Sequence, residues 1–101
     1  MNLTNQPLIT KAVLRKAKAT GDTVTIAATI FSPERMKEPP GDYMCRFQIG
    51  TMFDGVRVIY GVDEFQAVIL AIQIIDAMLS KQYQDFVILE ENGGEYRCHS
   101  G

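Results

Sequence analysis

One stretch, residues 61–79, constrains the fold most, because it predicts a single long helix that is apolar over most of its surface. Asp63 is a residue type that caps helix N-termini, and Gln66 follows where it can reach back to the cap's own amide, so the pair predicts a capping box. A sheet covers an apolar helical stripe of roughly 100°, and this helix offers about twice that width. Something besides one sheet must therefore cover the rest of the apolar helix surface. The polar side chains gather in one narrow sector: Gln66, Gln73, Asp76 and Ser80.

Length and composition predict one domain spanning residues 1–101. The chain is 47% hydrophobic and 22% charged with a net charge of −2, so it can bury a core without disulfides and has no general attraction for nucleic acid or anionic lipid. The start lacks the basic and apolar regions of a signal peptide, and we expect a cytoplasmic protein with Cys45 and Cys98 as thiols. The apolar run 67–79 is shorter than the roughly 20 residues that a membrane span needs.

Two stretches before the helix, residues 8–18 and 22–31, alternate and predict the first hairpin. In both stretches the even-numbered residues are mainly apolar. A three-residue loop at 19–21, with Gly21 in the left-handed conformation, would place both even sets on one sheet face. Residues 32–42 contain three prolines and predict a surface loop.

Residues 43–52 and 56–60 predict the second hairpin, closed by a two-residue turn at Asp54-Gly55 that sets Ile49 opposite Tyr60. The order β-β-β-β-α indicates an α+β fold, an antiparallel sheet of two hairpins with one long helix packed on one face. A short β-rich tail follows, either as a hairpin around 92–94 or as one segment over the helix. The predicted sheet face is Leu14, Val24, Ile26, Ile30, Phe47, Ile49 and Val58, packed against Phe65, Val68, Ile72, Ile75 and Leu79.

The sequence contains few signals of a catalytic, cofactor or metal site. It has no glycine-rich phosphate loop, and two cysteines with one histidine are too few for a zinc site, so we predict no cofactor, no metal and no catalytic residue. Capping explains Asp63, and Asp76 falls on the polar sector, which predicts a solvated side chain. The basic residues of the first hairpin point to both faces without interleaved aromatics, which disfavours nucleic-acid binding. A pocket at the helix start, if one exists, would use Tyr60, Asp63 and Gln66.

The pattern Tyr43-x-Cys45-x-Phe47-x-Ile49, followed by Tyr60-Gly61-Val62-Asp63-x-Phe65-Gln66-Ala67, resembles a family of small uncharacterised bacterial domains. In that family an aromatic-x-Cys strand precedes a helix opened by Gly-Val-Asp and continued by Gln-Ala. The resemblance covers about residues 43–80, and Tyr43 stands where members often have Trp. It implies a fold and a cytoplasmic bacterial setting but no reaction. Alternation places Cys45 on the core face as a small buried hydrophobe.

Two classes of function remain open. We favour a noncatalytic interaction or regulatory module, and the alternative is a small enzyme or ligand-binding protein with a pocket at the helix start. The apolar helix face left over after packing on the sheet must be covered by residues 86–89 or by a second copy. We favour a homodimer, because a helix face repeated about a two-fold axis is self-complementary. Its interface would contain Leu70, Ile74, Ala77 and Met78, with Leu70, Ile74 and Met78 near the axis.

Overall fold

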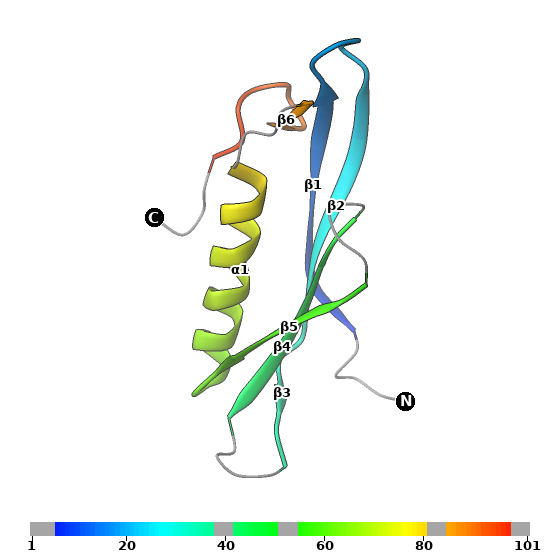
Figure 1. The fold of residues 1–101 in the computed structure, drawn as a ribbon. Helices are drawn as coiled ribbons and strands as arrows, with labels where there is room; N and C mark the ends of the chain where they lie inside the picture. Colours follow the sequence, from blue (N-terminus) through cyan, green and yellow to red (C-terminus); the bar gives the residue numbers. More distant parts are fainter. Residues whose placement is uncertain (1–5, 38–41, 51–54, 81–84, 98–101) are drawn as a thin grey trace.

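The computed structural model describes residues 6–37, 42–50, 55–80 and 85–97. One helix, α1 (Glu64–Ser80), runs along one face of an antiparallel sheet, which confirms the α+β prediction (Figure 1). The described part of this helix is neither long nor apolar enough to cross a membrane. The strands are β1 (Pro7–Ala17), β2 (Thr23–Phe31), β3 (Glu34–Arg35), β4 (Tyr43–Ile49), β5 (Arg57–Gly61) and β6 (Phe86–Glu90).

The sheet is built from antiparallel neighbours. β1 lies between β2 and β6. Phe47 of β4 pairs with Ile30 of β2 on one edge and with Arg57 of β5 on the other. The two-residue strand β3, inside the predicted surface loop, continues the β2 edge with Glu34 opposite Met44. Because β6 pairs with β1, the C-terminal segment extends the sheet, and the alternative of a lone segment over the helix is wrong.

The register of the first hairpin differs from the prediction. Val13 pairs with Ile26, and Leu14 pairs with Thr25. The turn occupies residues 18–21, closed by a 2.8 Å hydrogen bond from the Ala17 amide to the Asp22 carbonyl. The turn has four residues instead of the predicted three. Odd-numbered residues of β1 therefore pair with even-numbered residues of β2. Val13 is therefore fully buried, whereas Leu14 is half-buried on the opposite face. Val24 is exposed although its parity is that of the buried Ile26.

The second hairpin shows the same kind of shift. Cys45 pairs with Ile59, not with an even-numbered residue as the two-residue turn at Asp54-Gly55 requires. Ile59 therefore points to the core, and Val58 and Tyr60 lie on the face away from the helix and are exposed. Asp54 lies outside the described residues. The inner face of β4 is confirmed, because Cys45, Phe47 and Ile49 are buried.

The helix contacts the sheet through a stripe that begins at two small residues, Ala67 and Ala71, and continues to Ile75 and Leu79. The prediction is correct for Ile75 and Leu79, while Val68 and Ile72 are half-buried. It is wrong for Phe65, which is 81% exposed. The small residues permit close contact with the end of β5: a Cβ atom on Gly61 would lie 2.5 Å from the Ala67 amide nitrogen. This contact turns the helix so that Phe65 faces away from the core.

The helix cap forms largely as predicted. Oδ1 of Asp63 accepts a 2.8 Å hydrogen bond from the Gln66 amide, as an N-cap side chain does. The return bond differs by one residue, because Oε1 of Gln66 accepts from the Val62 amide at 2.7 Å instead of from the amide of Asp63. Both side chains are thus occupied in fixing the path from β5 into α1.

Candidate functional site

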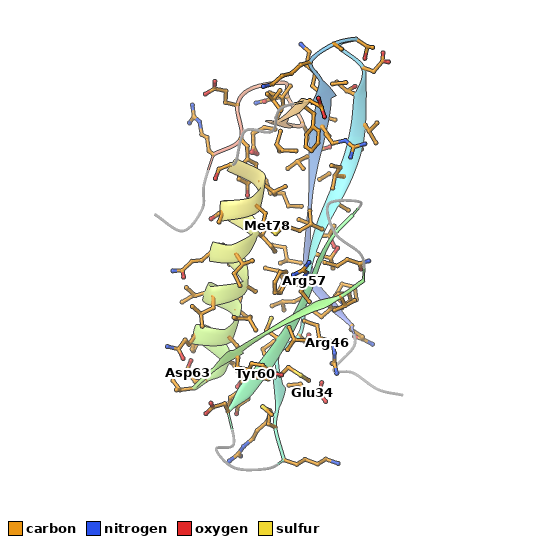
Figure 2. The ribbon with its side chains drawn as sticks, in the orientation of Figure 1. Glu34, Arg46, Arg57, Tyr60, Asp63 and Met78 are labelled. Carbon is orange, nitrogen blue, oxygen red and sulfur yellow. The ribbon has the colours of Figure 1, made fainter. Side chains whose placement is uncertain are left out.

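The three residues considered for a pocket at the helix start do not form one unit. Asp63 and Gln66 are exposed and bonded within the cap, and Asp63 and Tyr60 both lie near the N-terminal end of α1 (Figure 2). Tyr60 is 52% exposed, on the sheet face away from the helix. The structure therefore brings Asp63 and Gln66 together for capping and leaves Tyr60 apart.

An apolar cavity of about 180 Å³ lies elsewhere, along the flank of α1 that faces β1. It exists because α1 packs mainly on β4 and β5. Ile9, in the N-terminal half of β1, remains 59% exposed. We call this space the cavity; its lining is Ile9, Lys11, Ala28, Ile30, Ile72, Ile75, Asp76 and Tyr96.

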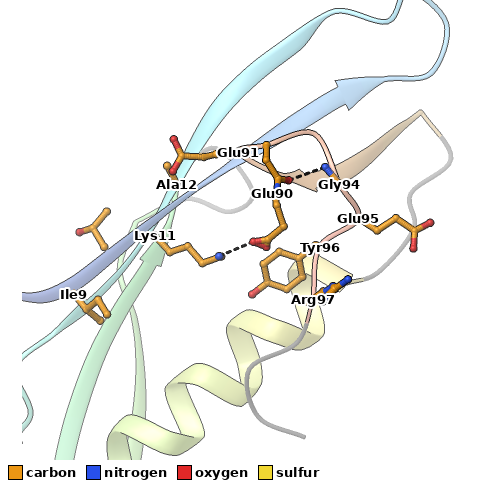
Figure 3. A pocket seen from close by; sticks show the side chains of 11 residues that line it. Ile9, Lys11, Ala12, Glu90, Glu91, Gly94, Glu95, Tyr96 and Arg97 are labelled. Carbon is orange, nitrogen blue, oxygen red and sulfur yellow. Dashed lines mark hydrogen bonds and ion pairs between the residues drawn. The ribbon is translucent and has the colours of Figure 1, made fainter.

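A larger and more polar hollow of about 1230 Å³ adjoins the cavity (Figure 3). It lies between β1 and the tail, residues 91–97, which follows β6. The cavity and the hollow share Ile9, Lys11 and Tyr96, so these three side chains form the boundary between them. The charged side chains that line the hollow are Lys11, Glu90, Glu91, Glu95 and Arg97.

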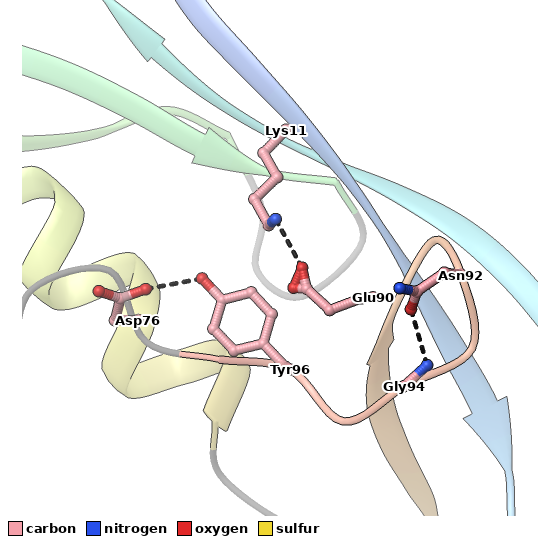
Figure 4. A network of polar contacts seen from close by, with 6 residues as sticks. All are labelled: Lys11, Asp76, Glu90, Asn92, Gly94 and Tyr96. Atoms are coloured by element: carbon pink, nitrogen blue, oxygen red, sulfur yellow. Dashed lines mark hydrogen bonds and ion pairs between the residues drawn. The ribbon is translucent and has the colours of Figure 1, made fainter.

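Four polar side chains from separate segments meet at this boundary (Figure 4). The hydroxyl group of Tyr96 donates a 2.7 Å hydrogen bond to Oδ1 of Asp76. Nζ of Lys11 donates a 2.6 Å bond to Oε1 of Glu90 and lies 5.8 Å from the centroid of the Tyr96 ring. The tail, α1, β1 and β6 are thereby joined at one point.

Asp76 corrects a sequence prediction. We expected a solvated side chain, but Asp76 is only 3% exposed. A buried carboxylate is costly unless it is hydrogen-bonded, and Tyr96 supplies a donor. The helical pattern could not show this, because the covering residue belongs to the tail. One signal was available: Asp76 is the only charged residue in 65–80.

Glu90 shows the opposite case, a buried carboxylate oxygen that lacks a hydrogen bond from the described residues. Oε2 is buried and has no hydrogen-bond partner among the described residues, although the side chain as a whole is 20% exposed. A buried acceptor without a partner typically costs about 1–3 kcal/mol. The hollow therefore has in its wall a carboxylate able to accept a further hydrogen bond.

The site contains two hydrogen-bonded pairs, and in each pair a carboxylate accepts from a donor on another segment. Side chains of these four types can bind polar groups of a ligand, and the same types serve as general acids and bases in enzymes. In the described part of the chain, no group of three or more His, Cys, Asp and Glu side chains could hold a metal ion.

Cys45 has the structural role that its alternation predicts. It is fully buried, and its thiol donates to the Phe31 carbonyl at 3.5 Å. Burial raises the pKa of the Cys45 thiol, which makes the reactive thiolate scarce. The thiol is thus part of the core and not of a reactive site.

Most of the helix residues considered for a dimer interface are less exposed than they would be on an isolated helix. Leu70, Ile74 and Met78 are half-buried and Ala77 is exposed. Ile74 and Met78 pack partly against the core. The most exposed large apolar side chains of α1 are Phe65 and Ile69.

These features define a small α+β domain in which a single helix covers part of an antiparallel sheet and leaves a cavity at its flank. The chain belongs to a family described as a domain of unknown function, DUF6968, whose model matches residues 13–99. The match contains Asp76, Glu90 and Tyr96, and it extends well beyond the 43–80 segment of the sequence resemblance. No curated protein and no solved structure matches the chain.

Proposed function

We propose that this chain is a noncatalytic binding module that takes the apolar body of a small ligand into the cavity beside α1. One observation carries the proposal: an apolar cavity of about 180 Å³ opens next to a few convergent polar groups, which is the usual form of a small-molecule site. An apolar cavity of about 150 Å³ accepts a benzene-sized molecule. The body of the ligand is therefore about one ring in size.

The proposal combines two readings of the sequence. It keeps the noncatalytic character of the favoured interaction module, and it takes the ligand pocket from the alternative but places that pocket at the helix flank instead of the helix start. The polar groups at the flank are bonded to one another in pairs that suit recognition. A cytoplasmic bacterial setting is also proposed, on the sequence resemblance alone.

The partner that we propose for the helix is a second copy of the chain. Leu70, Ile74 and Met78 retain part of their apolar surface, and they lie on the helix flank opposite Ile72 and Asp76 at about 100° per residue. A dimer through that row would leave the cavity open. The two proposals are therefore compatible.

Amide NMR spectra of the labelled protein test the binding proposal. We expect 2-phenylethanol to cause saturable shifts at Ala28, Ile30 and Ile72, and we expect the compound to be recovered unchanged. Ile72→Phe should fill the cavity and abolish the shifts. Ile69→Phe is the matched control, because Ile69 lies on the same helix, is 49% exposed and does not line the cavity. Shifts that persist in Ile72→Phe, or no saturable shifts in the wild type, would overturn the proposal.

A further inference from the structure

We infer that the ligand of this site is a small organic cation, whose apolar body occupies the cavity and whose ammonium group lies in the adjoining hollow against Glu90. This inference rests on the proposed function. It adds the charge of the ligand and the direction in which the ligand lies.

The charges around the site favour a cation. Among the described residues, the hollow is lined by two basic side chains, Lys11 and Arg97, and by three carboxylates, Glu90, Glu91 and Glu95. Asp76 adds a fourth carboxylate in the wall of the adjoining cavity. Hollows lined with an excess of one charge concentrate ligands of the opposite charge. A ligand with one positive charge reduces this imbalance, and an anion increases it.

Glu90 supplies the specific contact. Its Oε1 already accepts from Lys11 at 2.6 Å, while Oε2 is buried without a partner among the described residues. A carboxylate has about four acceptor positions, so binding Lys11 leaves capacity for another donor. The last torsion of a glutamate side chain is soft, so we expect a small rotation to present a carboxylate oxygen to a ligand in the hollow that Glu90 lines. A hydrogen bond from an ammonium group to a carboxylate is stronger than one from a neutral donor.

The boundary residues fix the direction of the ligand. The cavity is mainly apolar and the hollow is polar, and both are lined by Tyr96. A molecule that crosses this boundary places its apolar end beside Ile72 and its charged end beside Glu90. The small cavity limits the apolar end to about one ring or a short alkyl chain, which identifies the class as arylalkyl or short alkyl amines.

Three compounds with the same ring test the charge: 2-phenylethylamine, 2-phenylethanol and phenylacetate. Isothermal titration of the wild type at pH 7 and low salt should show the amine binding at least tenfold more tightly than the alcohol, with the acid weakest. The advantage of the amine should shrink as salt is added, because screening weakens contacts between charges near the surface.

Glu90→Gln tests the contact with little change of shape. The advantage of the amine over the alcohol should fall below about threefold, with the alcohol binding as before. Glu64→Gln is the matched control, because it removes the same charge from an exposed position in the first turn of α1, outside both linings. It should keep the full advantage of the amine.

The outcomes separate the inference from the proposed function. If the alcohol or the acid binds the wild type as tightly as the amine, the cation inference is overturned and the binding module stands. If none of the three compounds binds, both fall. If Glu90→Gln does not fold, the ratio of affinities in the wild type and its dependence on salt decide the question.

Discussion

The hydroxyl group of Tyr96 donates a hydrogen bond of 2.7 Å to Oδ1 of Asp76, and this bond joins the tail to α1. It links two residues that are 20 positions apart in the sequence. The bond provides a buried carboxylate with a hydrogen-bond donor (Figure 4). Tyr96 also lines both the cavity and the hollow. The tail is therefore a structural part of the candidate site.

Removing this hydroxyl group should destabilise the fold. We expect Tyr96→Phe to lower the free energy of unfolding by about 1–3 kcal/mol, because a buried carboxylate loses a donor. Chemical denaturation measures the change. Tyr60→Phe is the matched control, since Tyr60 is exposed, and its effect should stay within about 0.5 kcal/mol. Equal effects of the two substitutions would show that the Tyr96 bond contributes nothing to stability.

The helix cap gives a second test, which separates stability from binding. Asp63→Ala should lower the free energy of unfolding by about 1 kcal/mol, the usual contribution of an N-cap. Asp63→Asn should cost much less, because asparagine caps about as well. Ligand binding in the folded fraction should be unchanged, since Asp63 lines neither the cavity nor the hollow. A stable Asp63→Ala variant that had lost binding would move the site back to the helix start.

The buried thiol makes a prediction about pH. The raised pKa of Cys45 means that the unfolded chain loses this proton at lower pH than the folded chain does. Its contribution to stability is therefore complete below the ordinary thiol pKa and is lost as pH rises through the raised value. In Cys98→Ser, whose only thiol is Cys45, a thiol reagent at pH 8 should react slowly with the native protein and fully in denaturant. Fast reaction in the native state would contradict the burial.

The proposed dimer is tested by light scattering at micromolar concentration. We expect the wild type to be a dimer and Ile74→Glu to be a monomer, because a buried charge at the interface is costly. Gln73→Glu adds the same charge at the adjacent, exposed position and should leave the dimer intact. A monomeric wild type would exclude this interface.

Local sequence signals located the main elements correctly. The alternation of β4 identified Cys45, Phe47 and Ile49 as core residues, and Asp63 marked the start of the helix. These predictions succeed because they depend only on neighbouring residues. The pairing of the hairpins failed because turn length sets which residues face each other, and Gly21 at a φ of 79° fits a three-residue or a four-residue turn.

The candidate site could not be predicted for a different reason. It depends on where α1 lies across the sheet and on contacts between α1 and the tail. Asp76 reads as a polar helix residue in isolation, and its burial follows only once Tyr96 is placed beside it. The pairing of β1 with β6 brings Lys11 and Glu90 together, although the two residues are 79 positions apart in the sequence. No local sequence pattern predicts contacts between residues so far apart in the chain.

A crystal structure of the protein with 2-phenylethylamine tests the central claim most directly. We expect the ring of the compound between Ile30 and Ile72, in the cavity beside Tyr96, with Lys11 still paired to Glu90. A complex in which the compound binds at another surface while the cavity stays empty, or in which side chains close the cavity, would contradict the assignment of this site.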